Sequence, residues 1–159
     1  MRAAPWDGLG LAQAPLPEAE SSDYGACRAE LHGLRQVLHL VLRVAKTTPT
    51  KTGQFVTVWK RAHAGAEIAP LDDGDAIDLV IIFASDDSQH GYFIFPRAVL
   101  LEQGVMSRAG QGGKRALRVY PPWCAPPSRQ ALRTQRWQAA CFVADGDMPL
   151  RLAQLAGGA

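Results

Sequence analysis

The stretch Asp78-Leu79-Val80-Ile81-Ile82-Phe83-Ala84 decides the fold of this 159-residue chain. Six consecutive apolar residues without polar alternation are typical of a strand that is covered on both faces. The polar, turn-forming segment Ser85–Gly91 separates this run from a second apolar run, Tyr92–Phe95, which Pro96 ends. The two runs are therefore predicted to pair as a hairpin at the centre of a sheet.

Further elements are predicted on both sides of this hairpin. Phe55–Lys60 and Ala116–Tyr120 are rich in β-branched and aromatic residues, which favour strands. Arg97–Gln103 is expected to form a short helix, and a longer helix is expected from Ser128, which can cap it, to about Val143. The loop 47–53 is expected to precede the first of these strands, because it contains proline and glycine.

Upstream, apolar residues recur at spacings of three and four, which predicts an amphipathic helix from about Asp23 to Lys46. These residues are Leu31, Leu34, Leu38, Val41, Leu42 and Ala45. The predicted fold is a single α/β (α+β) domain in the order αβββαβα, with a central mixed four-stranded sheet flanked by helices. Residues 1–20 are expected to form a loose N-terminal arm, residues 21–145 the domain, and residues 146–159 a C-terminal tail.

Composition excludes several classes of protein. With 47% hydrophobic and 20% charged residues the chain can fill a core, so wholesale disorder is not expected. No apolar run approaches the roughly 18 residues of a membrane-spanning helix, and the N-terminal segment lacks the pattern of a secretory signal. Cys27, Cys124 and Cys141 have no Cys-x-x-Cys spacing, which argues against a disulfide framework or a zinc site. A cytoplasmic protein without a membrane partner is expected.

The charge is arranged in blocks along the chain. Residues 28–61 hold seven basic residues and one acidic residue, residues 62–96 hold seven acidic residues and no lysine or arginine, and residues 97–137 hold eight basic residues and one acidic residue. If folding brings the two basic segments together on one face, the protein has the electrostatic character of a polyanion binder. The alternative is that the acidic and basic blocks pair with each other on the surface.

The C-terminal helix is predicted to carry a basic ridge. Arg129, Arg133 and Arg136 lie at i, i+4 and i+7, so their guanidinium groups share one face and can pair with phosphate oxygens. A solvated helix face without a ligand explains the same spacing. The opposite, packing side is expected to comprise Leu132, Ala139, Phe142 and Val143.

The strand before that helix is predicted to have one wet face. A period of two places Lys114, Ala116, Arg118 and Tyr120 on this face, and Arg115, Leu117 and Val119 on the other. Tyr120 and Trp123 are candidates for stacking on nucleic-acid bases, although Trp123 between prolines can equally pin its loop to the core. Trp59 and Trp137 are assigned to packing.

Motifs for enzyme chemistry are sparse. The loop Thr47–Gln54 offers hydroxyls, a lysine and a glycine to a phosphate, but it is not a P-loop, and an ordinary turn is the alternative. His32 and His39 lack a ligand pattern, and no nucleophile or zinc-protease motif is present. The acidic turn Asp72–Asp78 can hold a hard cation, although a solvated turn explains it as well.

Several segments of the chain form a specific combination: Ala45–Arg61 (AKTTPTKTGQFVTVWKR), Ile77-Asp78, Gly91–Arg97 (GYFIFPR), Gly113-Lys114-Arg115 and Arg118–Trp123 (RVYPPW). Together they resemble the MepB family of small bacterial proteins, over about residues 23–142. The resemblance implies a fold related to the restriction-endonuclease-like core. Active nucleases of that superfamily place an Asp at the second core strand and an acid-x-Lys triplet on the third, which together bind magnesium.

Asp78 occupies the first of these nuclease positions, but the third strand reads Tyr92-Phe93-Ile94-Phe95, without carboxylate or lysine. We therefore expect a non-catalytic nucleic-acid-binding protein, with DNA favoured over RNA, no cofactor, and Asp78 as a relic. A metal-dependent nuclease around Asp78, which needs Mg²⁺, and a protein-interaction module are the alternatives. The expected contact residues are Thr48, Thr50, Lys51, Gln54, Lys60, Arg61, Lys114, Arg115, Arg118, Arg129, Arg133 and Arg136, with Tyr120 and Trp123 as stacking candidates.

Overall fold

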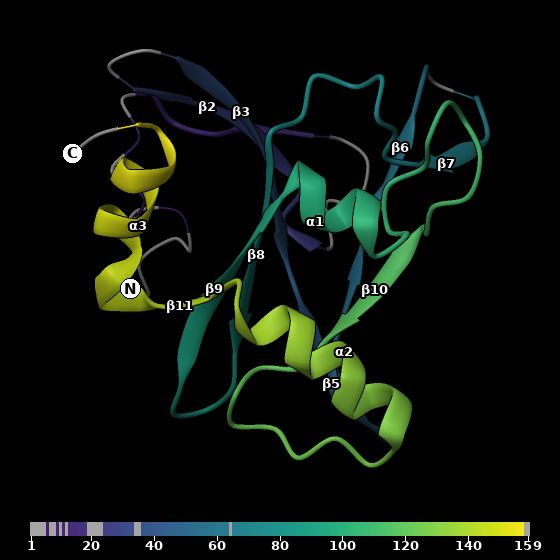
Figure 1. Ribbon diagram of the computed structural model, residues 1–159, viewed down its shortest axis with the longest axis vertical. Coiled ribbons are helices and arrows are strands. Elements are labelled where there is room, and N and C mark those ends of the chain that lie inside the picture. The colour runs from purple at the N-terminus through teal and green to yellow at the C-terminus, as the bar shows by residue number, and fades with distance from the viewer. Residues whose placement is uncertain are drawn as a thin grey trace.

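The computed structural model describes residues 6, 9, 11, 13–18, 24–33, 36–63 and 65–157. Within these residues the largest sheet has six strands (Figure 1). The strands are β1 (Leu16–Pro17), β2 (Cys27–His32), β3 (Val37–Val44), β8 (Leu79–Ser85), β9 (His90–Pro96) and β11 (Phe142–Ala144). Their order across the sheet is β1-β2-β3-β8-β9-β11. The chain is thus a mixed α+β domain, and its main sheet is wider than the four strands predicted.

The centre of the sheet is the predicted hairpin. Strands β8 and β9 pair antiparallel with Ile81 opposite Ile94. On its other edge β8 pairs parallel with β3, where Leu42 lies opposite Ile81. Strand β8 is buried at nearly every position, because it has a strand on each side and a core on each face. The prediction of a central, doubly covered strand is confirmed.

The crossover from β3 to β8 contributes strands β4 to β7 to two small sheets. Strands β4 (Lys46–Thr48), β5 (Lys51–Thr57) and β10 (Ala116–Val119) form a three-stranded sheet in the order β10-β5-β4. Strands β6 (Trp59–Arg61) and β7 (Ile68–Pro70) form a second, antiparallel pair. The expected loop 47–53 is therefore mostly a hairpin with its turn at Pro49-Thr50, and the expected strand 55–60 is divided at Val58.

Three α-helices lie among the described residues. They are α1 (Arg97–Glu102), α2 (Arg129–Ala139) and α3 (Met148–Leu155), and a 3-10 turn, Asp145–Asp147, precedes α3. Ser128 caps α2 as predicted, since its hydroxyl accepts a hydrogen bond from the Ala131 N–H at 3.1 Å. None of the helices in this part of the chain is long and apolar enough to cross a bilayer.

Each face of the main sheet has its own hydrophobic core. On one face Val41, Val80 and Phe93 pack against the small sheet of β5 and β10 and against α1 and α2. On the other face Leu40 and Ile81 pack with α3 and with residues near the N-terminus. Figure 1 shows α3 on one side of the sheet, and α1, α2 and β10 on the other. The second group of elements, which includes α2 and β10, builds the candidate site.

The helix predicted between Asp23 and Lys46 is wrong, because the described part of this segment forms the antiparallel strands β2 and β3. Leu38, Leu40 and Leu42 point into one core, while Val41 points into the other. A strand with apolar residues on both faces also satisfies spacings of three and four, so the pattern imitated a helix. Asp23 and Leu34 lie outside the described residues.

The two ends of the chain differ from the loose arm and the tail that the sequence suggested. At the N-terminus the described residues Trp6 and Leu9 are buried, and Leu16–Pro17 pairs with β2 as β1. At the C-terminus α3 buries Met148 and Leu152 against the main sheet. Apolar side chains from both ends therefore complete the second core, because without them one face of a doubly apolar sheet would be exposed.

Candidate nucleic-acid interface

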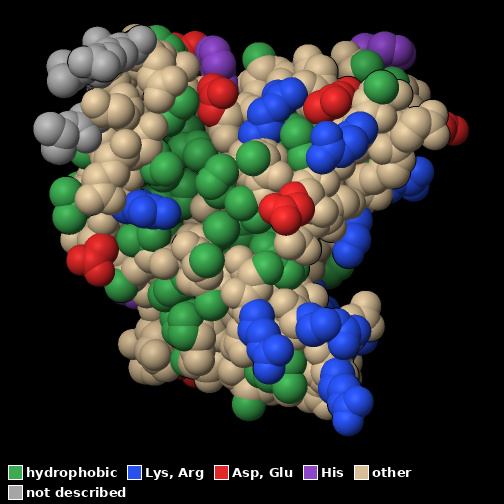
Figure 2. Space-filling model, in the orientation of Figure 1, with side chains coloured by type: hydrophobic (Ala, Val, Ile, Leu, Met, Phe, Trp, Pro, Cys, Tyr) green, Lys and Arg blue, Asp and Glu red, His purple; other side chains and the backbone are tan. Residues whose placement is uncertain are grey.

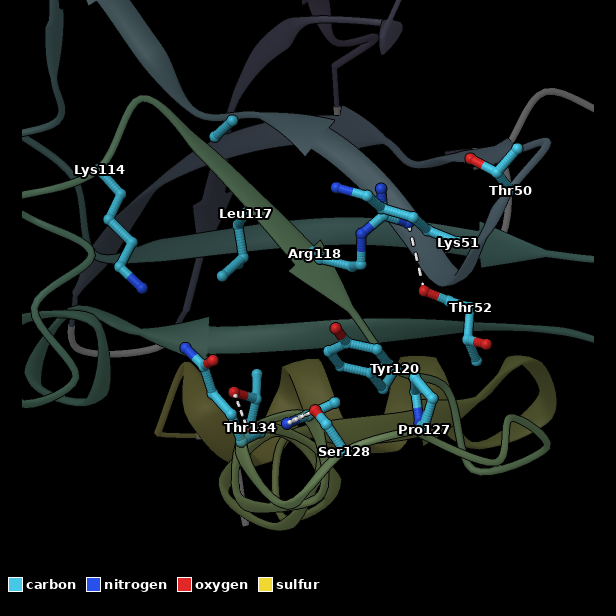
Figure 3. A pocket seen from close by; sticks show the side chains of 13 residues that line it. Thr50, Lys51, Thr52, Lys114, Leu117, Arg118, Tyr120, Pro127, Ser128 and Thr134 are labelled. Carbon is cyan, nitrogen blue, oxygen red and sulfur yellow. Dashed lines mark hydrogen bonds between the residues drawn. The ribbon is translucent and has the colours of Figure 1, made fainter.

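A cleft of about 570 Å³ lies between the β5–β10 pair and the N-terminal half of α2 (Figure 3). One wall comes from the two strands, and the other comes from the helix and the loop before it. The residues that line the cleft are Thr50, Lys51, Thr52, Lys114, Ala116, Leu117, Arg118, Tyr120, Pro127, Ser128, Gln130, Ala131 and Thr134. Hydroxyls, amides and cations predominate among them.

Strand β10 provides the basic wall through its period of two. Lys114, Ala116, Arg118 and Tyr120, the predicted wet face, all line the cleft. Leu117 and Val119 are buried in the core behind it, although Leu117 also touches the cleft. The predicted division of this strand agrees with the structure for the wet face and for Leu117 and Val119, whereas Arg115, predicted on the packed face, is exposed.

The Arg118 guanidinium is held over the β4–β5 hairpin. Its Nη1 donates to the Thr48 hydroxyl oxygen at 3.1 Å and to the Thr52 carbonyl oxygen at 3.3 Å. The guanidinium carbon also lies 5.9 Å from the centre of the Phe55 ring, within the range of a cation–π contact. A preorganised guanidinium loses little side-chain entropy when it binds an anion.

Tyr120 lies between the strand wall and α2 (Figure 3). Its ring packs on the backbone of Gly53, where an added Cβ would lie 2.8 Å from the ring atom Cδ1. Gly53 also has a φ of 82°, so this close approach and the backbone conformation both require glycine. The position of the aromatic ring at the end of the cleft is thus set by its neighbour on β5.

Helix α2 is fastened to β10 by a buried glutamine. Gln138 Nε2 donates to the Arg118 carbonyl oxygen at 3.0 Å, and Gln138 Oε1 accepts from the Tyr120 N–H at 2.8 Å. Gln135 Nε2 donates to the carbonyl oxygens of Pro121 and Cys124, which ties the following loop to the same helix. Gln138 is not among the residues predicted from the sequence; its place on the helix opposite the arginines was the available signal.

The electrostatic character of the cleft is positive. Lys51, Lys114 and Arg118 line it, and no acidic side chain belongs to its described lining. A concave surface with one sign of charge concentrates the field and attracts anions. Figure 2 shows further Lys and Arg side chains gathered over α2, below a notch in the right-hand edge of the molecule.

The arginine ridge is adjacent to the cleft but not in it. Arg129, Arg133 and Arg136 are exposed, and α2 presents Gln130, Ala131 and Thr134 to the cleft instead. The predicted packing side of the helix is partly wrong. Leu132 and Ala139 are exposed, Phe142 and Val143 belong to β11, and the buried positions of α2 are Ala131 and Gln138.

Four expected contact residues lie away from the cleft. Lys60 Nζ is 2.7 Å from Asp75 Oδ1, and Arg61 Nη1 donates to the Ala66 carbonyl oxygen. Gln54 is buried, and its amide donates to the Thr47 hydroxyl and to the Ser85 carbonyl oxygen. Arg115 is exposed on β10, outside the cleft. Among the described residues, the cations that the two basic segments bring to the cleft are therefore Lys51, Lys114 and Arg118.

The two stacking candidates lie on different sides of the loop that follows β10. Tyr120 lines the cleft, whereas Trp123 stands edge-on to Phe142, with ring centres 5.8 Å apart. Trp137 packs against Phe95 as expected. The Trp59 ring lies under the Arg61 guanidinium, whose carbon is 5.5 Å from the ring centre.

Asp78 serves as a backbone acceptor at the start of β8. Its Oδ2 accepts from the His39 N–H at 2.7 Å, and its own N–H donates to the His39 carbonyl oxygen at 2.9 Å. The residue thus joins β8 to β3. In the part of the chain that the structure describes, no three His, Cys, Asp or Glu side chains are grouped to hold a metal ion.

The acidic turn holds a neighbouring loop through its carboxylates. Asp72 accepts from the Ser107 hydroxyl at 2.6 Å and from the N–H groups of Gly110 and Gly74 at 2.9 and 3.0 Å. These hydrogen bonds, that of Ser107 above all, hold the pKa of the Asp72 carboxyl well below its usual range. Asp73 accepts from the Ala109 N–H in the same way. The turn is a structural clamp on residues 107–110.

Fold and site together define a small mixed α+β domain with a basic cleft between a three-stranded sheet and a helix. The family model described as MepB-like matches residues 18–144. A crystal structure of MepB superposes with a TM-score of 0.74 at 33% identity, over 83% of this chain and 85% of that one. No curated protein sequence matches the chain significantly. The chain belongs to the MepB-like family.

Proposed function

We propose that this chain is a non-catalytic nucleic-acid-binding protein that holds a sugar-phosphate backbone in the basic cleft. The observation that carries the proposal is the lining of the cleft. Lys51 on β5, Arg118 on β10 and Lys114 in the loop before β10 all line it, together with several hydroxyls and no acid in the described lining. Phosphate contacts supply most of the sequence-independent affinity for nucleic acids, and such a lining matches their charge and their hydrogen-bonding oxygens.

The size of the cleft is compatible with a short segment of a single strand. A volume of about 570 Å³ is in the range of pockets that enclose a drug-sized ligand, and a few nucleotide units have that size. Proteins that bind single strands combine a basic groove with aromatic side chains, and Tyr120 provides such a ring at the end of the cleft. DNA remains the preferred partner of the proposal, and sequence specificity is not part of it.

The restriction-endonuclease-like relationship belongs to the same proposal. Its support is the β8–β9 hairpin that begins after Asp78 and is followed by α1. The first helix of the restriction-endonuclease-like core is replaced in this chain by β2 and β3, and β9 has no acidic or lysine side chain. The Asp78 carboxylate binds the His39 backbone, which fits a structural relic better than a metal ligand.

Titration of fluorescein-labelled oligonucleotides at several salt concentrations tests the proposal. Three phosphate contacts predict that log K falls by about 2 per decade of salt for a single strand and by about 2.7 for a duplex. If Arg129, Arg133 and Arg136 also contact phosphates, the single-strand slope rises to about 4. Binding that is absent at low salt, or that does not respond to salt, contradicts the proposal.

A matched pair of variants assigns the effect to the cleft. Arg118→Gln removes a cleft cation and is expected to lower the slope by about 0.7 on a single strand. Arg151→Gln removes an exposed cation from α3, on the opposite face of the main sheet, and is expected to leave the slope unchanged. Equal effects of the two substitutions would show that net charge, and not the cleft, governs binding.

The alternatives give distinct results in the same samples. Cleavage of the oligonucleotide with Mg²⁺, lost on Asp78→Asn, would support the nuclease instead. Binding to proteins without affinity for oligonucleotides at low salt would support the protein-interaction module.

A further inference from the structure

A second hollow, of about 580 Å³, lies beyond the loop that follows β10. Its walls come from the turn between β8 and β9, from the loop residues Pro122 and Trp123, and from Phe142 on β11. Both aromatic rings are only partly buried, so each offers some surface to a ligand. Planar apolar groups of this kind are the surfaces on which nucleobases stack.

The aromatic frame of this hollow is rigid. Phe142 packs edge-on against Phe93 in the core, with ring centres 5.2 Å apart, and Trp123 stands on Phe142 at an angle of 82°. Phe142 reaches this position because β9 has Gly91 beneath it, where an added Cβ would meet the ring atom Cζ at 2.3 Å. The indole of Trp123 is therefore held from behind by the core.

Polar groups surround the rings. His90, at the start of β9, has its Nε2 at 3.1 Å from Asp145 Oδ2. The exposed Gln89 lies on the turn between β8 and β9. Asp86 fixes this turn, since its Oδ1 accepts from the N–H groups of Ser88 and Gln89 at 2.9 and 2.7 Å. Such donors and acceptors can pair with the edge of a base whose face lies on Trp123.

The hollow is within reach of a strand bound in the cleft. Tyr120 lines the cleft and Trp123 lines the hollow. Because Trp123 follows Tyr120 by three positions in the chain, their Cα atoms are at most about 11 Å apart. The hydrogen bonds from Gln135 to the carbonyl oxygens of Pro121 and Cys124 fix the loop between them. A strand with its phosphates on Arg118 can pass over this loop within one or two nucleotides.

We infer that the hollow is a stacking subsite for one base of a single strand whose phosphates lie in the cleft. The inference rests on the proposed function and adds selectivity to it. Bases in a duplex are stacked on each other and cannot enter the hollow without being flipped out. A single strand presents its bases freely, so Trp123 favours single strands over duplexes.

The test compares a labelled twelve-nucleotide oligothymidylate with a labelled twelve-nucleotide strand of abasic sites, by fluorescence anisotropy. Trp123→Ala is expected to lower the affinity for the base-bearing twelve-mer by about 5- to 150-fold, which corresponds to the ~1–3 kcal/mol of one base–aromatic stack. Trp123→Phe keeps an aromatic face and is expected to recover most of the affinity. Trp59→Ala, outside both hollows, is the tryptophan control.

The abasic strand separates stacking from structure. It retains the phosphates but has no base to stack, so Trp123→Ala is expected to leave its affinity unchanged. An equal loss on the abasic strand means that Trp123 only shapes the cleft, and overturns the inference. If Trp123→Ala keeps the wild-type affinity for the base-bearing strand, the inference is also overturned. Salt-dependent binding that needs Arg118 would still leave the proposed function intact. Absence of all binding at low salt overturns both.

Discussion

The side-chain oxygen of Gln138 on α2 accepts a hydrogen bond from the backbone N–H of Tyr120 at 2.8 Å. The nitrogen of the same amide donates to the Arg118 carbonyl oxygen at 3.0 Å, and the side chain is fully buried. One residue of the helix therefore satisfies two backbone groups at the end of β10. It sets the position of α2 relative to the strand that carries the cleft cations.

Gln138→Met is expected to lower the free energy of unfolding by about 2–4 kcal/mol, because two backbone groups lose their partners while the side-chain volume is kept. Gln154→Met, on an exposed position of α3, is the control and is expected to change stability by less than about 0.5 kcal/mol. Urea denaturation measures both. A Gln138→Met protein as stable as the wild type would show that the two hydrogen bonds contribute no net stability.

Local periodicity explains which parts of the cleft could be predicted. Arg118 and Tyr120 were placed correctly because a strand with one packed face alternates strictly, and Leu117 and Val119 mark that face. Gln138 was missed because a polar side chain on a helix is expected to be exposed. Its partners are backbone groups of another element, and a single sequence does not show which segments will meet.

The wrong first helix has a different cause. In β3 the side chains of Leu38 and Leu40 enter one core and that of Val41 enters the other, so nearly every position is apolar. The central hairpin has the same property, but its shorter runs and its turn left no room for a helix. The run before Thr47 was long enough for either element, and only tertiary pairing with β8 decides between them.

The ion pair between Lys60 and Asp75 shows why the basic segments do not converge fully. Lys60 Nζ lies 2.7 Å from Asp75 Oδ1, and the two side chains are 30% and 23% exposed. Lys60→Met is expected to lower the free energy of unfolding by no more than about 1 kcal/mol and to leave the oligonucleotide affinity unchanged. Lys51→Met, in the cleft, is expected to weaken binding. If Lys60→Met weakens binding as much as Lys51→Met does, Lys60 leaves Asp75 to contact the nucleic acid.

The clamp at Asp72 makes stability depend on pH in the acid range. Hydrogen bonds from Ser107, Gly110 and Gly74 lower the pKa of this carboxyl in the folded chain, whereas an unfolded Asp has a pKa of about 3.9. The unfolded chain therefore binds a proton first as the pH falls. The stabilisation is complete well above pH 4 and is lost as the pH falls below the unfolded value towards the lower, folded one.

Melting temperatures measured between about pH 6 and pH 2.5 test this prediction. The wild type is expected to lose stability more steeply than Asp72→Asn, which starts lower at pH 6, so the two curves converge in acid. Ser107→Ala, which removes the largest cause of the shift, is expected to give an intermediate curve. Parallel curves for wild type and Asp72→Asn would contradict the prediction.

Arg43 is a buried cation on β3, only 1% exposed. Its Nη1 donates to the Leu42 carbonyl oxygen at 3.0 Å, and its Nη2 lies 3.5 Å from Glu18 Oε2. Burial lowers the pKa of the guanidinium, and the charge of Glu18 opposes that shift. Glu18 also binds Arg28 Nε at 2.7 Å, so one carboxylate compensates two cations.

Glu18→Gln and Arg43→Met are therefore expected to have unequal effects. Glu18→Gln leaves the buried guanidinium without its counter-charge, and breaking a buried pair costs about 3–5 kcal/mol, reduced here to about 2 kcal/mol because Glu18 is 23% exposed. Arg43→Met removes the cation together with its desolvation cost and keeps an apolar side chain of similar length, so it is expected to be nearly neutral. Urea denaturation of both variants and of the double variant compares their free energies of unfolding. If Arg43→Met is the more destabilising of the two, the buried arginine is a net stabilising group, which contradicts the prediction.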